Sequence, residues 1–83
     1  MTDLTEDIAG LVESVVRPLL DHPDELELSA SVDGSEILVE LNVNEEDAGK
    51  VIGRQGRVIK AIRTLARAAA SRDGMHVEVE LVD

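Results

Sequence analysis

Two stretches of alternating apolar and polar residues, separated by Asp33-Gly34, constrain the fold of this chain more than any other feature. Residues 26–32 and 37–43 each place an apolar side chain at every second position, which is the period of a β-strand with one buried face. An Asp-Gly pair between two such stretches favours a two-residue primed turn, in which both central residues take positive φ. The sequence therefore predicts an antiparallel hairpin, with Asp33 and Gly34 at the centre of its turn.

Residues 3–16 predict an amphipathic helix before the hairpin. Apolar residues recur there at spacings of three and four, which places them on one stripe. Asp3 is a candidate N-cap, and Pro18 lacks the N–H that a continuing helix needs, so we expect the helix to end near residue 16. Leu19 and Leu20 are expected to pack inward from an irregular turn.

Two more helices and a third strand are predicted after the hairpin. Asn44 is a candidate N-cap for a short helix that ends at Gly53. Gly56 opens a longer helix that stops at Gly74, and residues 75–82 alternate again. The longer helix has its apolar positions at Val58, Ile59, Ile62, Leu65, Ala66 and Ala69. This order predicts an α+β fold with the pattern α-β-β-α-α-β, in which the helices pack on one face of a three-stranded sheet.

Length and composition limit the class of protein. The 83 residues, 43% of them hydrophobic, suffice for a single domain over residues 1–83 with one core. The absence of cysteine excludes a disulfide framework, a thiolate nucleophile and a sulfur-ligated metal. The chain has no apolar run long enough to cross a bilayer, and acids stand where a secretion signal needs bases. We therefore expect a cytoplasmic protein with no membrane partner.

The charges are segregated along the chain. Seven of the eight bases and none of the eighteen acids lie between residues 50 and 72, so that segment carries +7 and the rest carries −17. This pattern indicates one anion-binding surface on an acidic body, or else a basic helix that neutralises acids in its own fold or in a partner. Because the chain has no aromatic residue, nucleic-acid bases would have no ring to stack on, and binding would rest on backbone, hydrogen-bond and aliphatic contacts.

Gly53 and Gly56 form a Gly-x-x-Gly connection inside this basic segment. Gly53 can end the first helix at little conformational cost, and Gly56 lets another backbone approach the start of the second helix. A helix N-terminus attracts phosphate, and Arg54 and Arg57 add positive charge and planar donors. Alone, two such glycines also fit a tight turn without a ligand. The surrounding aliphatic pairs, the basic segment and the order of elements favour phosphate binding.

The sequence resembles the KH domain of type II, because Ile52, Gly53, Gly56 and Ile59 occupy the fixed positions of that family's I-G-x-x-G-x-x-I pattern. Over its whole length it is similar to the KhpA family of small bacterial single-KH RNA-binding proteins. The resemblance implies that the loop clamps the backbone of about four nucleotides of single-stranded RNA. It also implies a role as an RNA chaperone or post-transcriptional regulator, and a homodimer or a heterodimer with a larger KH-containing protein.

The resemblance also implies which residues bind RNA. The loop positions Arg54 and Gln55 would point at phosphates or sugars, and the family pattern does not separate groove from core among the flanking aliphatic residues. The candidate RNA-binding residues are Lys50, Ile52, Gly53, Arg54, Gln55, Gly56, Arg57, Ile59 and Lys60. An alternative is a protein-interaction module that keeps the KH scaffold and docks an acidic partner on its basic helix.

We expect no enzyme, no metal and no cofactor. The acidic run at residues 45–47 is interpreted as a solvated helix start that matches the helix dipole, not as a metal site. His22 and His76 lie far apart and have no partners at ligand spacing. The serines lack a nucleophile motif, and the glycine loop lacks the ending of a P-loop. A small enzyme acting on a phosphorylated metabolite would have only the helix N-terminus to support it.

Overall fold

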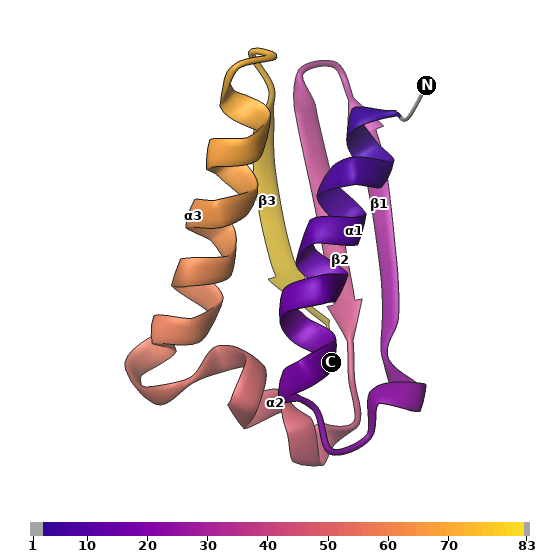
Figure 1. Ribbon diagram of the computed structural model, residues 1–83, viewed down its shortest axis with the longest axis vertical. Helices are drawn as coiled ribbons and strands as arrows, with labels where there is room; N and C mark the ends of the chain where they lie inside the picture. The colour runs from indigo at the N-terminus through magenta and orange to yellow at the C-terminus, as the bar shows by residue number, and fades with distance from the viewer. Residues whose placement is uncertain (1–2, 83) are drawn as a thin grey trace.

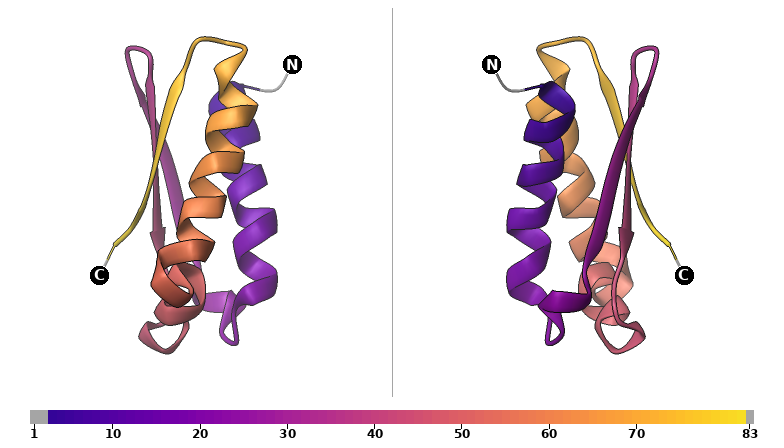
Figure 2. Two further views of the ribbon diagram at one scale, coloured as in Figure 1. Left: turned by 90° about the vertical axis from the view of Figure 1, so that its left-hand side faces the viewer. Right: turned by 90° about the vertical axis from the view of Figure 1, so that its right-hand side faces the viewer.

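A three-stranded sheet forms one layer of the protein, and the helices cover one of its faces (Figures 1 and 2). The computed structural model describes residues 3–82. The helices and strands, in chain order, are α1 (Leu4–Val16), β1 (Glu27–Asp33), β2 (Glu36–Asn42), α2 (Glu45–Ile52), α3 (Arg57–Ser71) and β3 (His76–Leu81). Single 3-10 turns span Arg17–Leu19, Pro23–Glu25 and Arg54–Gly56. The predicted α+β order is confirmed.

The predicted N-caps of α1 and α2 are both confirmed. The side chain of Asp3 accepts a hydrogen bond from the backbone N–H of Thr5 at 3.1 Å. Asn44 accepts in the same way from the N–H of Glu46 at 2.9 Å. Each cap satisfies a backbone donor that the first turn of a helix leaves without a partner.

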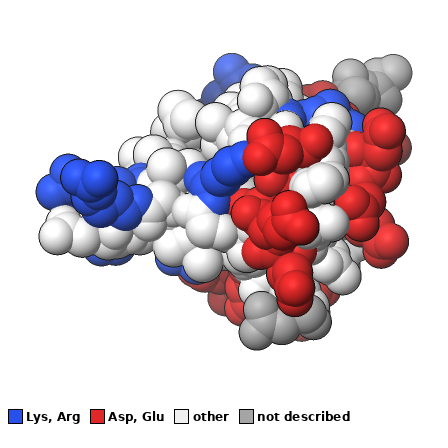
Figure 3. Space-filling model, turned by 90° about the horizontal axis from the view of Figure 1, so that it is seen from below, with Lys and Arg blue, Asp and Glu red and all other residues white. Residues whose placement is uncertain are grey.

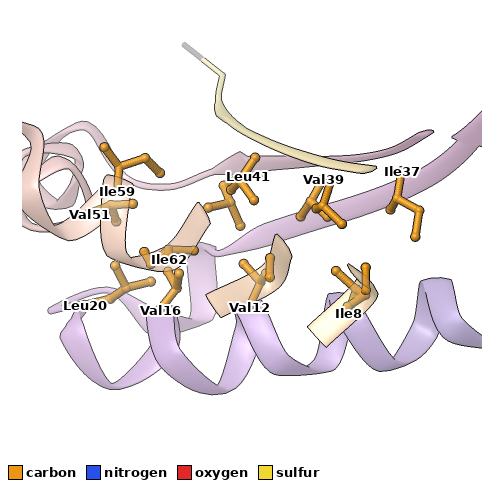
Figure 4. Packing of buried hydrophobic residues seen from close by; sticks show 14 residues of the cluster. Ile8, Val12, Val16, Leu20, Ile37, Val39, Leu41, Val51, Ile59 and Ile62 are labelled. Carbon is orange, nitrogen blue, oxygen red and sulfur yellow. The ribbon is translucent and has the colours of Figure 1, made fainter. Parts of the chain in front are cut away.

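Strand β2 lies at the centre of the sheet, with β1 antiparallel to it on one side and β3 parallel to it on the other. The side chains of Ile37, Val39 and Leu41 are at most 1% exposed, and Figure 4 shows residues of α1 facing them across the core. The core consists of Ile8, Val12, Val16, Leu20, Ile37, Val39, Leu41, Val51, Ile59, Ile62, Ala66, Ala70, Val77 and Val79. It is built from aliphatic side chains alone.

The hairpin is confirmed, but its turn lies one residue later than predicted. Asp33 pairs with Glu36, so the central residues are Gly34 and Ser35. Only Gly34 has positive φ, at 61°. A two-residue turn with positive φ at its first central position is of type II′, whereas the prediction assumed positive φ at both positions.

Three apolar side chains expected to face inward are exposed instead. Leu19 is 39% exposed because the 3-10 turn after α1 directs Leu20, and not Leu19, into the core. Val32 is 51% exposed near the hairpin end of an edge strand. Leu65 is 49% exposed because it lies about 100° around α3 from the buried Ala66.

No helix within residues 3–82 has the length and hydropathy needed to cross a membrane.

Candidate nucleic-acid interface

The connection between α2 and α3 is a tight reversal of the chain. Gly53, Gln55 and Gly56 all have positive φ, at 76°, 57° and 73°. The N–H of Gly53 donates to the carbonyl of Gly49 at 2.8 Å, and the N–H of Gly56 donates to the carbonyl of Gly53 at 3.1 Å. Gln55 is the one non-glycine residue among residues 3–82 with positive φ, which costs roughly 1 kcal/mol for an L-residue. The loop therefore holds some backbone strain at its tip.

The two glycines of the loop have different roles. A Cβ on Gly53 would lie 2.8 Å from both the backbone N and the Cβ of Val58, so only glycine fits between the end of α2 and the start of α3. A Cβ on Gly56 would meet nothing closer than Cε of Lys60, at 3.8 Å. Gly53 therefore packs the two helices together, whereas the surface over Gly56 is open to another molecule. The sequence did not reveal the contact with Val58.

Three bases around this loop have no acidic partner in the part of the chain that the structure describes. Arg54, Arg57 and Lys60 are exposed, and within residues 3–82 none of them has a carboxylate within 4.0 Å. Nη2 of Arg57 instead donates to Oε1 of Gln55 at 3.1 Å. Figure 3 shows Lys and Arg atoms at the tip of the protruding α2–α3 end, with Asp and Glu atoms gathered elsewhere on the same view. Among residues 3–82, three of the bases without a carboxylate partner therefore lie at the loop.

Bases outside the loop are engaged within the fold. Nε of Arg63 donates to the carbonyl of Val79 at 3.0 Å, and Nε of Arg67 donates to the carbonyl of Val77 at 3.2 Å. Arg67 also pairs with Glu78 at 3.0 Å. The middle of α3 thus uses its bases to hold strand β3, whereas the bases of the loop are exposed. That the loop binds an anion stays a prediction.

Lys50 is also engaged. Its ammonium pairs with Asp21 and lies 3.6 Å from Asp47. The hydrogen bond to Asp21, followed by the charges of Asp21 and Asp47, raises the pKa of Lys50. Lys50 therefore remains charged, but its charge is partly compensated before any ligand arrives.

The aliphatic candidates separate clearly between surface and core. Ile52 is 42% exposed beside the loop. Ile59 is 7% exposed and Val51 is fully buried, so both belong to the core, and Val58 packs against it. Of these four residues, Ile52 offers the most apolar surface to a ligand.

Asp47 is fully buried, so the expectation of a solvated acidic run is wrong for this residue, although Glu45 and Glu46 are exposed. Its two carboxylate oxygens accept the backbone N–H groups of Asp21 and His22, each at 2.9 Å. These bonds fasten the segment between α1 and β1 to the first turn of α2. The partners lie 25 and 26 residues away in sequence, and no local pattern predicts such a contact.

The fold lowers the pKa of Asp47 and raises the pKa of His22. Burial disfavours the ionised carboxylate, but the two backbone donors and Lys50 outweigh it, so the pKa of Asp47 is lowered. The hydrogen bond to Glu46, followed by the charges of Asp47, Glu46 and Glu25, raises the pKa of His22.

Within residues 3–82, no three His, Asp or Glu side chains are arranged to hold a metal ion.

Comparison with known proteins agrees with this architecture. A model described as the KH domain of KhpA and KhpB matches residues 9–81. The chain belongs to the KhpA/KhpB KH-domain family. The chain is 40% identical to the "RNA-binding protein KhpA" of Bacillus subtilis over 83 residues, which is 100% of both chains. It is 46% identical to the protein of that name from Clostridium acetobutylicum over 72 residues, 87% of this chain and 96% of the relative. The family assignment and the type II KH fold are thereby confirmed.

Solved structures of a larger protein share the fold. Aquifex aeolicus Era bound to GDP.AlF4- superimposes with a TM-score of 0.65 at 18% identity, covering 99% of this chain and 33% of Era. Era in complex with MgGDPNP and nucleotides of 16S ribosomal RNA also gives 0.65, at 21% identity, covering 96% of this chain and 30% of Era. This chain thus spans about a third of Era, and the likeness concerns the fold.

Replacing Gly53 by alanine should destabilise the protein by roughly 2–4 kcal/mol, because the new Cβ meets Val58 and the backbone keeps positive φ. Gly49→Ala is the matched control in the same helix, since a Cβ there meets nothing within 4 Å; it should stabilise by about 0.5–1 kcal/mol. Urea unfolding followed by circular dichroism measures both. Equal stability of the two variants would contradict the Gly53–Val58 contact.

Asp47→Asn should lower the melting temperature at pH 7, because an amide cannot accept both backbone N–H groups. Glu45→Gln removes the same charge from an exposed position on the same turn and should have a much smaller effect. The pKa of Asp47 is lowered in the folded protein, so its ionised carboxylate stabilises the fold at any pH above the ordinary carboxyl pKa. That stabilisation is lost as the pH falls through the pKa that Asp47 has in the folded protein. The difference between Asp47→Asn and wild type should therefore shrink in acid. A difference that did not change with pH would contradict this account.

Proposed function

We propose that this chain binds single-stranded RNA, without catalysing a reaction, by clamping the RNA backbone at the loop from Gly53 to Gly56. In this proposal residues 1–83 form one KH domain. The observation that carries it is the coincidence of an open surface over Gly56 with three exposed bases that have no carboxylate within 4.0 Å among residues 3–82. The relatives named as RNA-binding proteins support the choice of RNA as the ligand.

In the proposed complex, a phosphate lies over Gly56 at the start of α3, where the helix dipole favours an anion. Arg54 and Arg57 contact neighbouring phosphates, and Lys60, whose Cε lies near Gly56, reaches the same phosphate group. The amide of Gln55 offers a hydrogen bond to phosphate or sugar.

The remaining candidate residues act less directly. Ile52 supplies aliphatic surface for a ribose or base edge. Lys50 contributes a smaller share of the binding energy, because Asp21 already holds its ammonium. Ile59 supports the loop from the core and offers little surface to RNA. The alternative of an acidic protein on helix α3 is weakened because Arg63 and Arg67 are bound to β3.

A domain with a net charge of −10 and few phosphate contacts should bind RNA weakly and with strong salt dependence. Three phosphate contacts on a single strand correspond to a slope of about −2 for log K against log salt. A second copy of the chain, or a larger KH-containing partner, would raise the affinity by supplying a second site. We propose a role as RNA chaperone or post-transcriptional regulator in the bacterial cytoplasm.

The test is a substitution in the loop matched by one of equal charge elsewhere. Arg54→Asp combined with Gln55→Asp should weaken binding of a labelled single-stranded RNA by at least roughly tenfold. Ser71→Asp combined with Arg72→Asp makes the same charge change at the far end of α3 and should leave binding within about threefold of wild type. Fluorescence anisotropy at two salt concentrations measures the affinities, and circular dichroism checks the folds.

The outcomes separate the possible sources of affinity. Loss of binding in the loop variant alone supports the clamp. Equal loss in both variants means that only net charge matters, and unchanged binding by a folded loop variant means that RNA is bound elsewhere. Either of the last two results contradicts the proposal.

A further inference from the structure

Side chains of α3 hydrogen-bond to one edge strand of the sheet, β3, and not to the other, β1, within residues 3–82. On β3, the N–H of His76 bonds to the carbonyl of Ser35 and the N–H of Val82 bonds to that of Leu41, so even-numbered residues face β2. The carbonyls of Val77 and Val79 therefore point away from the sheet. The side chains of Arg67 and Arg63 donate hydrogen bonds to these two carbonyls. Edge strand β3 is thus blocked by two cations.

Edge strand β1 has no comparable protection. Asp33 and Glu36 flank the two-residue turn and form a hydrogen-bonded pair. Hydrogen-bonded and non-hydrogen-bonded pairs alternate along an antiparallel ladder, so the N–H and C=O groups of Leu28, Ala30 and Val32 point away from β2. Within residues 3–82, no side chain hydrogen-bonds to these groups. The strand is seven residues long, pairs one-to-one with β2 without a bulge and contains no Pro or Lys. The right-hand view of Figure 2 faces this edge, and no helix is drawn across it.

The inner side of this open edge is apolar. Leu28 and Ala30 are half-buried and Val32 is 51% exposed, although they occupy the face of β1 that turns toward the helices. A shallow groove continues this surface between β1 and α1, where Ala9 and Gly10 present little bulk. An added strand would cover these side chains while its backbone bonded to the free groups of β1.

The charges around the edge indicate what such a strand would carry. Glu6 and Glu13 line the groove, and Glu27 and Asp33 stand at the two ends of β1. Glu13 is paired with Arg17, whereas the other three have no base within 4.0 Å among residues 3–82. These acids favour an incoming chain with Lys or Arg.

A second copy of this chain fits the edge poorly. Antiparallel pairing of two β1 strands about Ala30 would place Glu27 opposite Asp33 at both ends, and like charges directly opposite one another are destabilising. Each copy would also bring a net charge of −10 to the contact.

We propose that the open edge of β1 binds an extended, Lys- or Arg-rich segment of a partner protein as a fourth strand of the sheet. Main-chain hydrogen bonds to Leu28, Ala30 and Val32 would supply affinity, and alternate apolar and basic side chains would supply specificity. The β1 edge and the α2–α3 loop are separate parts of the chain, so one domain could hold a basic protein segment and RNA together.

The test uses a fluorescent, end-blocked heptapeptide of alternating Lys and Val, with a Glu–Val peptide as control. Wild type should bind the Lys–Val peptide and not the Glu–Val peptide. Ala30→Pro removes an outward N–H without removing a bond to β2, and should weaken binding about tenfold or more. Ala30→Val keeps the N–H and the net charge, and should bind like wild type.

Amide hydrogen exchange of the wild-type protein gives a readout that needs no variant. The amides of Leu28, Ala30 and Val32 should exchange faster than those of Ser29 and Ser31 in the free protein, and should become protected when the Lys–Val peptide binds. Unchanged exchange in saturating peptide would overturn the proposal.

Three further results would overturn it as well: no peptide binding by wild type, equal binding by Ala30→Pro and Ala30→Val, or equal binding of the two peptides. A stable wild-type dimer that Ala30→Pro dissolves would assign the edge to a second copy instead. RNA affinity should be unchanged in Ala30→Pro, so failure of this proposal is distinguishable from failure of the RNA clamp.

Discussion

The close approach of Gly53 to Val58 is the contact on which the candidate interface depends. It allows α2 to end and α3 to begin within four residues. It places Arg54 on the turn, and Arg57 directly after it, at an end that protrudes from the body of the protein. A bulkier residue at position 53 would separate the helices and move both cations. The strained φ of Gln55 is a further consequence of making the reversal so short.

Asp47 holds the other end of the same helix. Its carboxylate joins the first turn of α2 to the segment after α1, and Lys50 adds an ion pair to Asp21 in that segment. The short helix α2 is thus fixed at both ends, by a buried carboxylate at its start and by a glycine contact at its finish. A loop held in this way would need little reorganisation to bind the RNA backbone proposed for it, which would lower the cost of binding.

Local sequence patterns predicted most of the helices and strands, whereas several contacts between distant parts of the chain could not be predicted from them. Period-two alternation and the two side-chain caps predicted the elements within a residue or two, because these signals act between near neighbours. The position of the turn was missed because a Gly-Ser turn of type II′ competes with the Asp-Gly alternative. Burial of Asp47 and the binding of Arg63 to β3 depend on residues distant in sequence, and composition or spacing does not report them.

The fold divides a basic segment that looks uniform in sequence into two parts with different uses. Arg63 and Arg67 stabilise an edge strand, whereas the bases of the α2–α3 loop remain available to a ligand. The most direct test of this division is a ¹⁵N–¹H chemical-shift titration of the protein with single-stranded RNA. The account predicts that the amides of residues 52–57 shift most and that those of β1 and the second half of α3 barely move. Shifts concentrated on residues 63–71 or on the sheet would contradict it.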